Sequence, residues 1–392
     1  MRILFLMKNY AIGGVEVVSQ ILANKFYDEG HKVTFVAFEK PPELLTNELN
    51  KGIVIHVLDL PLYSESNVLK LKDIIIENNI DIIINQWGLP FEPTLLAFNA
   101  KKGTSVKYIS VQHNVPNNND RLVKVKTSIA NSRGFNKYLL KIKKKAIQFI
   151  TAKSMHYVYF RSDAYILLSQ SFIPIFKKFI NLKHCNKLEV ITNPITIDDK
   201  NFNYSESEKR REVIYVGRLD HNQKRVSRII ESWGLIESNN PDWKLTLIGD
   251  GPEKSNIISQ IKDLNLRNVT IEGFQNPKEY YKRSSILLLT SEYEGFPLVI
   301  AECMHFGVVP IVYGSYPAVY DIIRSEFDGI IVSPDENGFN SKLMAENLEK
   351  VMKHQNLLQE MAKNAIHTSK RFSVDKIYNL WLNLFERVIN QK

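Results

Sequence analysis

The feature that most constrains the fold is an alternation, sustained along the whole chain, of short apolar strands and helix-length segments. The strand candidates are rich in β-branched residues and apolar on both faces, as expected for parallel strands covered by helices on each side. Six occur in each half: RILFLM, KVTFVAF, IVIHVL, DIIINQ, VKYISVQ and AYILLS, then EVIYVG, KLTLIG, NVTIEG, ILLLTS, VPIVYG and GIIVSP. The sequence therefore predicts an α/β chain with two doubly wound parallel sheets.

The boundary between the two halves is expected in the polar stretch 192–212, which loses periodicity and reads as a linker. A chain of 392 residues fits two domains better than one. We place the first domain at 1–193 and the second at 194–372. The segment 376–390 predicts an amphipathic helix long enough to pack across a neighbouring domain.

Composition excludes several classes of protein. Hydrophobic residues make up 44% and charged residues 24%, and no apolar run approaches the ~18 residues of a membrane span. The first apolar stretch is strand-sized and lacks the pattern of a signal peptide. Cys185 and Cys303 are the only cysteines, which excludes a disulfide framework and a cysteine zinc site. A reducing cytoplasm is the expected compartment.

Positive charge is concentrated in residues 101–190, which hold 18 Lys or Arg against three acids, a net charge of +15 in a chain of +9. Such a block indicates an anionic partner, either phospholipid headgroups or nucleic acid, and a solvated lysine-rich face is the alternative. The interleaved segment NKYLLKIKKKAIQFI favours an interfacial amphipathic helix on a membrane. Its apolar members are Tyr138, Leu139, Leu140, Ile142, Ala146 and Ile147, and its cations are Lys137, Lys141 and Lys143 to Lys145.

The stretch SEYEGFPLVIAE, residues 291–302, predicts the end of a strand, a loop and then a helix that begins near Pro297. The amides after Gly295 favour an anion or a hydroxyl-rich group. Glu302 lies among apolar neighbours, and burying an unpartnered carboxylate costs several kcal/mol. The two hydroxyls of a ribose would satisfy it, while Glu294 would accept from a sugar. A helix salt bridge plus a turn acid is the alternative.

Further candidates follow other strands, at the edge where ligands of parallel sheets bind. VGRLDHNQKRV supplies Arg218 and Lys224, two cations suited to a diphosphate. KNYAIGGVEVV places Gly14 where a backbone can approach a phosphate or sugar. His113 follows another strand and suits a sugar contact, although a structural histidine is the alternative. Gly249, Gly251 and Gly273 follow further strands, where backbone groups near Phe274 and Gln275 suit a nucleobase edge.

Taken in order, these motifs resemble a retaining glycosyltransferase of family 4 with the GT-B architecture, in which two Rossmann-like domains face a central cleft. The resemblance covers nearly the whole chain and is strongest over 212–335. Its most specific element is the E-x7-E signature, from Glu294 to Glu302. Arg225, Cys303 and Ala318 depart from residues frequent in the family, and none of them removes a charge assigned to the donor.

The resemblance implies a role for each motif. Arg218 and Lys224 would hold the donor diphosphate, Glu302 the ribose, and Glu294 the donor sugar. His113 and Gly14 would approach the sugar and phosphate from the first domain, and the helix 373–392 would pack back on that domain. The remaining donor-binding residues would be Gly217, Gly249, Phe274, Gly295, Phe296, Pro297 and Leu298.

The reaction implied is transfer of a hexose or N-acetylhexosamine from a nucleotide diphosphate sugar, with a UDP-sugar expected, to an acceptor hydroxyl with retention of configuration. The first domain would bind the acceptor and the second the donor. No metal or other cofactor is expected, because no Asp-x-Asp lies near a strand end and cations stand at the diphosphate. The acceptor would be a lipid-linked saccharide or a surface or teichoic-type polysaccharide.

The protein would be cytoplasmic and peripherally bound to the inner face of the plasma membrane through its basic region. Three alternatives remain open. A nucleic-acid binder would use the basic block but would leave the glutamate pair unexplained. A catalytically silent partner subunit would keep the fold and only bind. A nucleotide-sugar epimerase would not account for the basic block.

Overall fold

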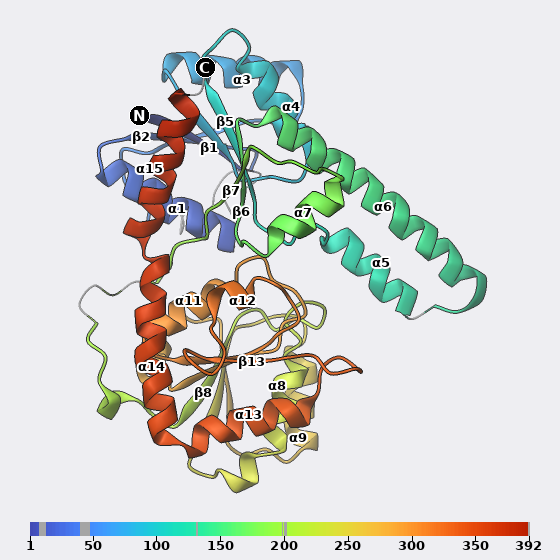
Figure 1. Ribbon diagram of the computed structural model, residues 1–392, viewed down its shortest axis with the longest axis vertical. Helices are drawn as coiled ribbons and strands as arrows, with labels where there is room; N and C mark the ends of the chain where they lie inside the picture. The colour runs from blue at the N-terminus through green and yellow to red at the C-terminus, as the bar shows by residue number, and fades with distance from the viewer. Residues whose placement is uncertain (8–12, 40–47, 131, 198, 200–201, 391–392) are drawn as a thin grey trace. The chain divides into compact units, whose positions relative to one another are not determined.

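The computed structural model describes residues 1–7, 13–39, 48–130, 132–197, 199 and 202–390 (Figure 1). The chain divides into two compact units. Unit 1 comprises Met1–Pro194 and Val374–Lys392, and unit 2 comprises Ile195–Ser373. The sequence placed these boundaries after residues 193 and 372.

Unit 1 is built on a seven-stranded parallel sheet of order β3-β2-β1-β4-β5-β6-β7. The order reverses between β1 and β4, so right-handed crossovers place α1 and α4 on opposite faces. The short strand β7 was missed by the sequence analysis. The strands are β1 (Arg2–Leu6), β2 (Lys32–Ala37), β3 (Val54–Val57), β4 (Ile82–Asn85), β5 (Lys107–Gln112), β6 (Ala164–Leu167) and β7 (Leu188–Val190).

The helices of unit 1 form two layers. Helix α1 packs on α15, while α4 packs on both α3 and α6. The last helix of the chain therefore belongs to the first unit. The helices are α1 (Gly14–Asp28), α3 (Glu65–Glu77), α4 (Phe91–Ala100), α5 (Asp120–Ala130), α6 (Gly134–Arg161), α7 (Phe172–Ile180) and α15 (Val374–Asn390).

Unit 2 repeats the same topology with six parallel strands in the order β10-β9-β8-β11-β12-β13. All six were predicted, because each contains a run of apolar residues; most of these runs are buried, whereas the edge strand β10 is only half-buried. The prediction of two doubly wound parallel sheets is confirmed. The strands are β8 (Glu212–Val216), β9 (Lys244–Ile248), β10 (Val269–Gly273), β11 (Ile286–Leu289), β12 (Val309–Tyr313) and β13 (Ile330–Val332).

The helices of unit 2 lie between and beside these strands, and α11 packs against α14. Short 3-10 turns occur at Glu206–Glu208, Glu237–Asn239 and Lys370–Phe372. The helices are α8 (Ser227–Gly234), α9 (Lys254–Asp263), α10 (Lys278–Arg283), α11 (Leu298–His305), α12 (Val319–Ile322), α13 (Ser341–Lys353) and α14 (Gln355–Ser369).

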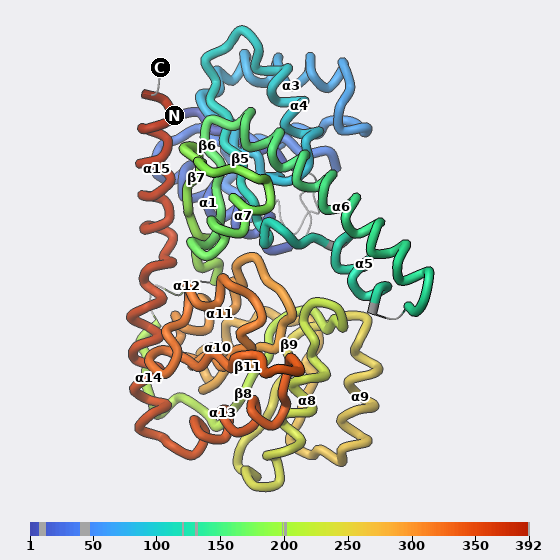
Figure 2. Tube along the Cα trace, turned by 45° about the vertical axis from the view of Figure 1, so that its right-hand side comes forward, coloured from blue at the N-terminus to red at the C-terminus, as the bar shows by residue number. Residues whose placement is uncertain are grey.

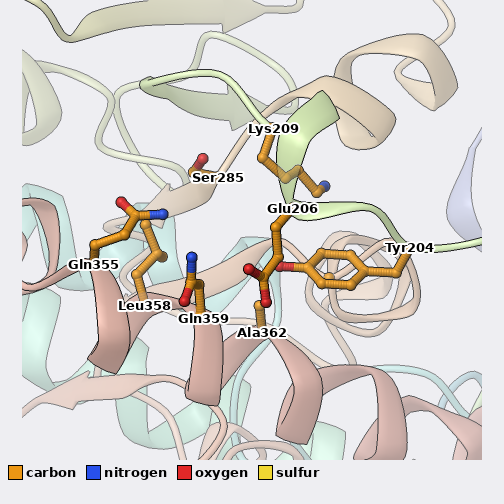
Figure 3. Close-up of a pocket in the computed structure, with 9 residues that line it drawn as sticks. Tyr204, Glu206, Lys209, Ser285, Gln355, Leu358, Gln359 and Ala362 are labelled. Atoms are coloured by element: carbon orange, nitrogen blue, oxygen red, sulfur yellow. The ribbon is translucent and has the colours of Figure 1, made fainter.

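The polar stretch 192–212 is more than a spacer, because its described part from Ile195 onward is packed on unit 2. Asp199 pairs with Lys278 and Lys282 of α10 at 3.2 and 3.0 Å. Further along, Lys209 lies in a small pocket beside α14, whose lining is drawn in Figure 3. This connecting segment, defined here as residues 195–211, therefore belongs structurally to the second unit.

Helices α5 and α6 form a hairpin that extends away from the unit 1 sheet in both views (Figures 1 and 2). Only the later part of α6 is anchored, through buried side chains from Thr151 to Tyr159. Its first four turns are mostly exposed. No helix in the described part of the chain is long and apolar enough to span a membrane.

Candidate active site

The strand order of unit 2 reverses between β8 and β11, and the loops that follow these two strands carry the site. Ligands of doubly wound sheets bind at this reversal, because the loops diverge there and leave a crevice. Lys224 follows β8 and Glu294 follows β11. Their side chains meet in an ion pair, with Lys224 Nζ 2.6 Å from Glu294 Oε1. Both side chains are largely buried, at 17% and 8% exposure.

Gln223 completes the surroundings of Glu294 and was missed by the sequence analysis. Its Nε2 donates to Glu294 Oε2 at 3.2 Å and to the Tyr293 carbonyl at 3.3 Å. The Glu292 amide donates back to the Gln223 carbonyl at 2.7 Å. Both carboxylate oxygens of Glu294 are therefore held by neighbours in the Lys224 loop. Adjacency to Lys224 was the only signal in the sequence.

Arg218 is placed differently from Lys224. Its guanidinium is 61% exposed and pairs with Asp220 at 3.0 Å, not with Glu294. The buried Asp220 carboxylate also accepts from the Gln223 amide at 2.7 Å, so it organises the whole loop. Burial, reinforced by the negative charges of Glu294 and Asp220, raises the pKa of Tyr215 well above its usual value. The two predicted cations therefore share a loop, but only Lys224 is tied to Glu294.

Gly217 and Gly249 are explained by packing between loops. A Cβ on Gly249, whose φ is +150°, would lie 1.8 Å from the Gly217 carbonyl oxygen. The Gly217 amide donates to the Ile248 carbonyl, which joins the ends of β8 and β9. These glycines are required by the fold of the edge itself, so their presence is not by itself a sign of a ligand.

The segment before α11 turns as the sequence indicated, with Pro297 as the residue that caps the helix. The Phe296 ring is 7% exposed and packs against Phe372, with ring centroids 5.4 Å apart. Phe274, at the end of β10, is by contrast 73% exposed. Of these two predicted donor contacts, only Phe274 presents its ring to solvent.

Glu302 is only 4% exposed, as its apolar neighbours in the sequence indicated. The reason given for a ligand there is corrected by the structure. Thr196 Oγ1 donates to Glu302 Oε1, and Tyr281 OH donates to Oε2 at 3.1 Å. Burial raises the pKa of Glu302, and these two hydrogen bonds oppose that shift. Protein hydroxyls therefore supply one hydrogen bond to each oxygen, so the carboxylate is not left unpartnered in the absence of a ribose.

In unit 1, the predicted residues lie at the corresponding edge of the sheet. Helix α1 begins at Gly14 directly after Gly13, and a Cβ on Gly13 would lie 2.5 Å from Glu16 Oε2. Burial raises the pKa of Glu16. The rest of the motif, residues 8–12, lies outside the described residues.

His113 follows β5, and its Nε2 lies 2.6 Å from Gln86 Oε1, just past β4. Burial lowers the pKa of His113 to about 4, so the ring is neutral at pH 7. Because the Gln86 oxygen only accepts, the proton of the neutral ring is on Nε2. Sequence reasoning missed Gln86, which fixes this tautomer.

A pocket of about 220 Å³ opens beside His113. Its polar lining consists mostly of side-chain amides, which both donate and accept hydrogen bonds. Such a lining suits hydroxyl groups. The lining includes Gln86, Trp87, Gln112, Asn114, Asn118 and Asn119. Within the described residues, no three His, Cys, Asp or Glu side chains are grouped to hold a metal ion.

The α6 surface carries an exposed apolar stripe, defined here as Phe135, Tyr138, Leu139, Ile142, Phe149 and Ile150. Their exposed fractions range from 47% to 73%. The spacing of three and four residues places all six on one side of the helix. Leu140 and Ile147, which the sequence assigned to the same surface, are instead half-buried. Helix α6 contains no acidic residue, and residues 120–153 hold ten Lys or Arg against one Asp.

Comparison with known proteins identifies the family. Residues 12–199 match the family described as Glycosyltransferase Family 4, and residues 196–368 match the family described as Glycosyl transferases group 1. Each match covers most of one structural unit. The chain belongs to the family-4 type of GT-B glycosyltransferases.

Individual relatives are distant. A Campylobacter jejuni protein, GalNAc-alpha-(1->4)-GalNAc-alpha-(1->3)-diNAcBac-PP-undecaprenol alpha-1,4-N-acetyl-D-galactosaminyltransferase, is 28% identical over 228 residues, 58% of this chain and 61% of that protein. The alignment thus spans less than two thirds of the relative. An uncharacterized glycosyltransferase of Haemophilus influenzae is 24% identical over 389 residues, 96% of this chain and 97% of that protein.

Among solved structures, Anabaena Alr3699/HepE in complex with UDP superposes with a TM-score of 0.76 at 18% identity. The match covers 99% of this chain and 100% of that one. At this identity, the likeness establishes the GT-B fold and nothing finer.

Proposed function

We propose that the protein transfers a hexose or N-acetylhexosamine from a UDP-sugar to a hydroxyl of a lipid-linked saccharide or surface polysaccharide, with retention of configuration and without a metal. The observation that carries this proposal is the buried Lys224–Glu294 pair at the strand reversal of unit 2. Family membership and the titles of relatives support the substrates, since one acts on a PP-undecaprenol-linked glycan and one binds UDP.

In this reaction the bond between the anomeric carbon and the diphosphate oxygen breaks, and the acceptor oxygen bonds to the same face of that carbon. The acceptor proton passes to the departing phosphate. The Lys224 ammonium donates once to Glu294 and has two further protons for phosphate oxygens. Arg218, exposed and fork-shaped, adds bidentate contacts. Both cations stabilise the charge that develops on the leaving group.

The other proposed contacts complete the donor site. Glu294 and the amides of Gly295 to Leu298 bind the donor sugar, and Glu302 binds the ribose. The exposed Phe274 ring and the strand ends at Gly217 and Gly249 border the nucleotide. In unit 1, Gly14 and His113 contact sugar and phosphate, and the amide-lined pocket beside His113 suits a saccharide.

The test is Lys224→Met, which keeps the length of the side chain and removes its charge. We expect kcat to fall by ~10²-fold, the scale for loss of one preorganised electrostatic donor. Lys353→Met is the matched control, because Lys353 also pairs with a glutamate, at 2.8 Å, but on α13. A Lys224→Met enzyme as fast as the wild type would reject the diphosphate clamp.

The catalytically silent alternative is separated by slow hydrolysis of nucleotide sugars. A panel of such sugars incubated with the isolated chain should yield UDP from one member, and Lys224→Met should abolish that release. Binding without any release by the wild type would instead favour a subunit that only binds.

We further propose that the protein binds its acceptor at an anionic membrane surface, and that α6 is the helix that binds this surface. The apolar stripe is largely exposed, its one recorded ring contact among the described residues being the Lys153 ammonium 5.6 Å from the Phe149 centroid, and lysines flank it along its length. Side chains of this kind insert at the headgroup level while lysines bind acidic lipids. An oligonucleotide would pair with the lysines but would leave the apolar stripe in water.

Co-sedimentation tests this surface. The wild type should bind vesicles containing phosphatidylglycerol and not those of pure phosphatidylcholine. Phe149→Ser/Ile150→Ser should weaken binding about tenfold or more, because two large apolar groups are lost. Ile258→Ser, at a 49% exposed position on α9, is the control. Equal binding by the stripe variant and wild type, or preference for an oligonucleotide, would refute membrane docking.

A further inference from the structure

The Glu302 carboxylate is held from two sides by segments distant in the sequence. Thr196 belongs to the connecting segment, two residues past the end of the first part of unit 1, and it donates to Oε1. Tyr281 lies on α10, is fully buried, and donates to Oε2 at 3.1 Å. A different element therefore controls each oxygen.

The number of hydrogen bonds matters for what Glu302 can still bind. An ionised carboxylate offers about four acceptor positions on two oxygens. Thr196 and Tyr281 occupy one position on each oxygen, which leaves one on each for a further donor. A pair of vicinal hydroxyls is the ligand chemistry that matches two adjacent acceptors of this kind.

We propose that Thr196 and Tyr281 are positioning residues for the donor, whose hydroxyls orient the ionised Glu302 carboxylate so that it can accept from both ribose hydroxyls. This inference rests on the ribose role proposed above for Glu302. Neither residue was among the site residues that the sequence indicated. Their contribution would appear as selectivity for a ribose over a deoxyribose.

The surroundings of Thr196 explain how its position is maintained. The connecting segment is tied to α10 through the Asp199 pairs with Lys278 and Lys282. Lys209, at the far end of the segment, donates to the carbonyls of Tyr281 and Phe306 at 2.9 and 2.7 Å. Thr196 is thus attached to the same two helices that carry Tyr281 and Glu302.

The charge of Glu302 depends on the same two hydroxyls. Burial raises the pKa of Glu302, and hydrogen bonds from Thr196 and Tyr281 lower it. Burial also keeps Tyr281 and Cys303 neutral, since it raises the pKa of both well above their usual values. Lys209 is the nearby cation at the end of α11, and the buried face of α14 carries no titratable side chain. Loss of either hydroxyl therefore favours the protonated acid.

The experiment compares the affinities of UDP and 2′-deoxy-UDP by isothermal titration calorimetry. The variants are Thr196→Val and Tyr281→Phe, which remove only the hydroxyl, and Glu302→Gln. Thr246→Val is the matched control, because Thr246 donates to another buried carboxylate of unit 2, that of Glu212, at 2.6 Å. Each titration is repeated from pH 5 to pH 8.

We expect the wild type and Thr246→Val to bind UDP more tightly than 2′-deoxy-UDP. In Thr196→Val and Tyr281→Phe, the ratio of the two affinities should be about three- to tenfold smaller. Their UDP affinity should also fall at a higher pH than that of the wild type as the solution is acidified. A purely structural role would lower affinity for both nucleotides equally and leave the pH profile in place, which would overturn the inference.

Glu302→Gln separates this inference from the proposed function. If Glu302→Gln keeps the full preference for UDP, Glu302 does not bind the ribose and the proposed site is wrong. If Glu302→Gln loses the preference while Thr196→Val and Tyr281→Phe retain it, the site stands and the positioning role is rejected.

Discussion

At the scale of single residues, His113 illustrates how burial selects a protonation state. Its Nε2 pairs with the Gln86 oxygen at the strand edge of unit 1. Because burial lowers the pKa of His113 to about 4, the folded protein holds the ring neutral where an unfolded chain would begin to protonate it. A neutral imidazole has one donor and one acceptor, and because the Gln86 contact uses the donor, the acceptor Nδ1 remains for a sugar hydroxyl.

This state predicts an acid-sensitive unit 1. The unfolded chain binds more protons at His113 between pH 6.5 and about 4, so the free energy of unfolding should fall as pH is lowered through that window. Above pH 6.5 the full contribution of the neutral ring should be present. The loss from this group should be up to about 3 kcal/mol. His113→Gln, which does not titrate, should flatten the dependence in urea unfolding. An unchanged slope would contradict a buried neutral ring.

Gly249 is a second residue with a strict local requirement, since its missing side chain leaves room for the Gly217 carbonyl. Gly249→Ala would bring a Cβ to 1.8 Å from that oxygen. We expect a loss of about 3 kcal/mol or more in unfolding free energy and weaker UDP binding, because the loop with Arg218 and Lys224 must move.

Gly103→Ala is the control for Gly249→Ala. Gly103 also has a positive φ of +81°, but nothing lies within 4 Å of a Cβ built there. Gly103→Ala should lower the free energy of unfolding by only about 1 kcal/mol, from backbone strain alone. Thermal unfolding measures both variants, and equal losses would show that strain, not the carbonyl contact, explains Gly249.

At the scale of elements, Lys209 joins the ends of two helices. Its ammonium donates to the carbonyls of Tyr281, Ser284 and Phe306, at the C-terminal ends of α10 and α11. Carbonyls at helix ends lack partners within the helix, and a cation there is favourable. Burial lowers the pKa of Lys209 to about 7, and the nearby Cys303 and Glu208 oppose that shift.

Removal of this cation should loosen unit 2. Lys209→Met leaves buried carbonyls without a donor, so we expect a loss of about 2–4 kcal/mol. Lys282→Met, which removes a partly exposed lysine with only side-chain ion pairs, should lower the free energy of unfolding far less. Chemical denaturation measures both, and hydrogen exchange should increase in α10 and α11 for Lys209→Met alone.

At the scale of the whole molecule, the chain leaves unit 1 once and returns to it with its last helix. Helix α15 packs on α1, where Phe385 and Tyr378 lie 5.5 and 5.4 Å from the Phe26 ring. Arg387 pairs with Glu189 at 2.8 Å. The N-terminal unit is therefore completed only after the C-terminal unit has been synthesised.

This arrangement predicts that damage to α15 destabilises the first unit. Trp381 is only 3% exposed, so Trp381→Ala should lower the free energy of unfolding by about 3–5 kcal/mol. Leu380→Ala, at a 45% exposed neighbouring position, should cost below about 1 kcal/mol. Hydrogen exchange should increase in α1 for Trp381→Ala. An increase confined to 195–373 would show that α15 supports the other unit instead.

The sequence by itself determined the architecture and the position of the central pair. Buried parallel strands are apolar runs, and their alternation with helices is local information. Lys224 and Glu294 were predictable as neighbours because both follow strands of one parallel sheet, whose carboxyl ends share an edge. The exposed character of the lysine-rich segment followed from its composition as well.

Only the tertiary structure decided which side chains complete the site. Thr196 is 106 positions from Glu302, and Gln223 is 71 positions from Glu294. Hydroxyl and amide residues are common, so no spacing distinguishes these from others. The same holds for the α6 stripe, because periodicity shows that a helix has an apolar side but not whether another element covers it. Such facts depend on contacts between distant segments, which the local pattern of a sequence does not encode.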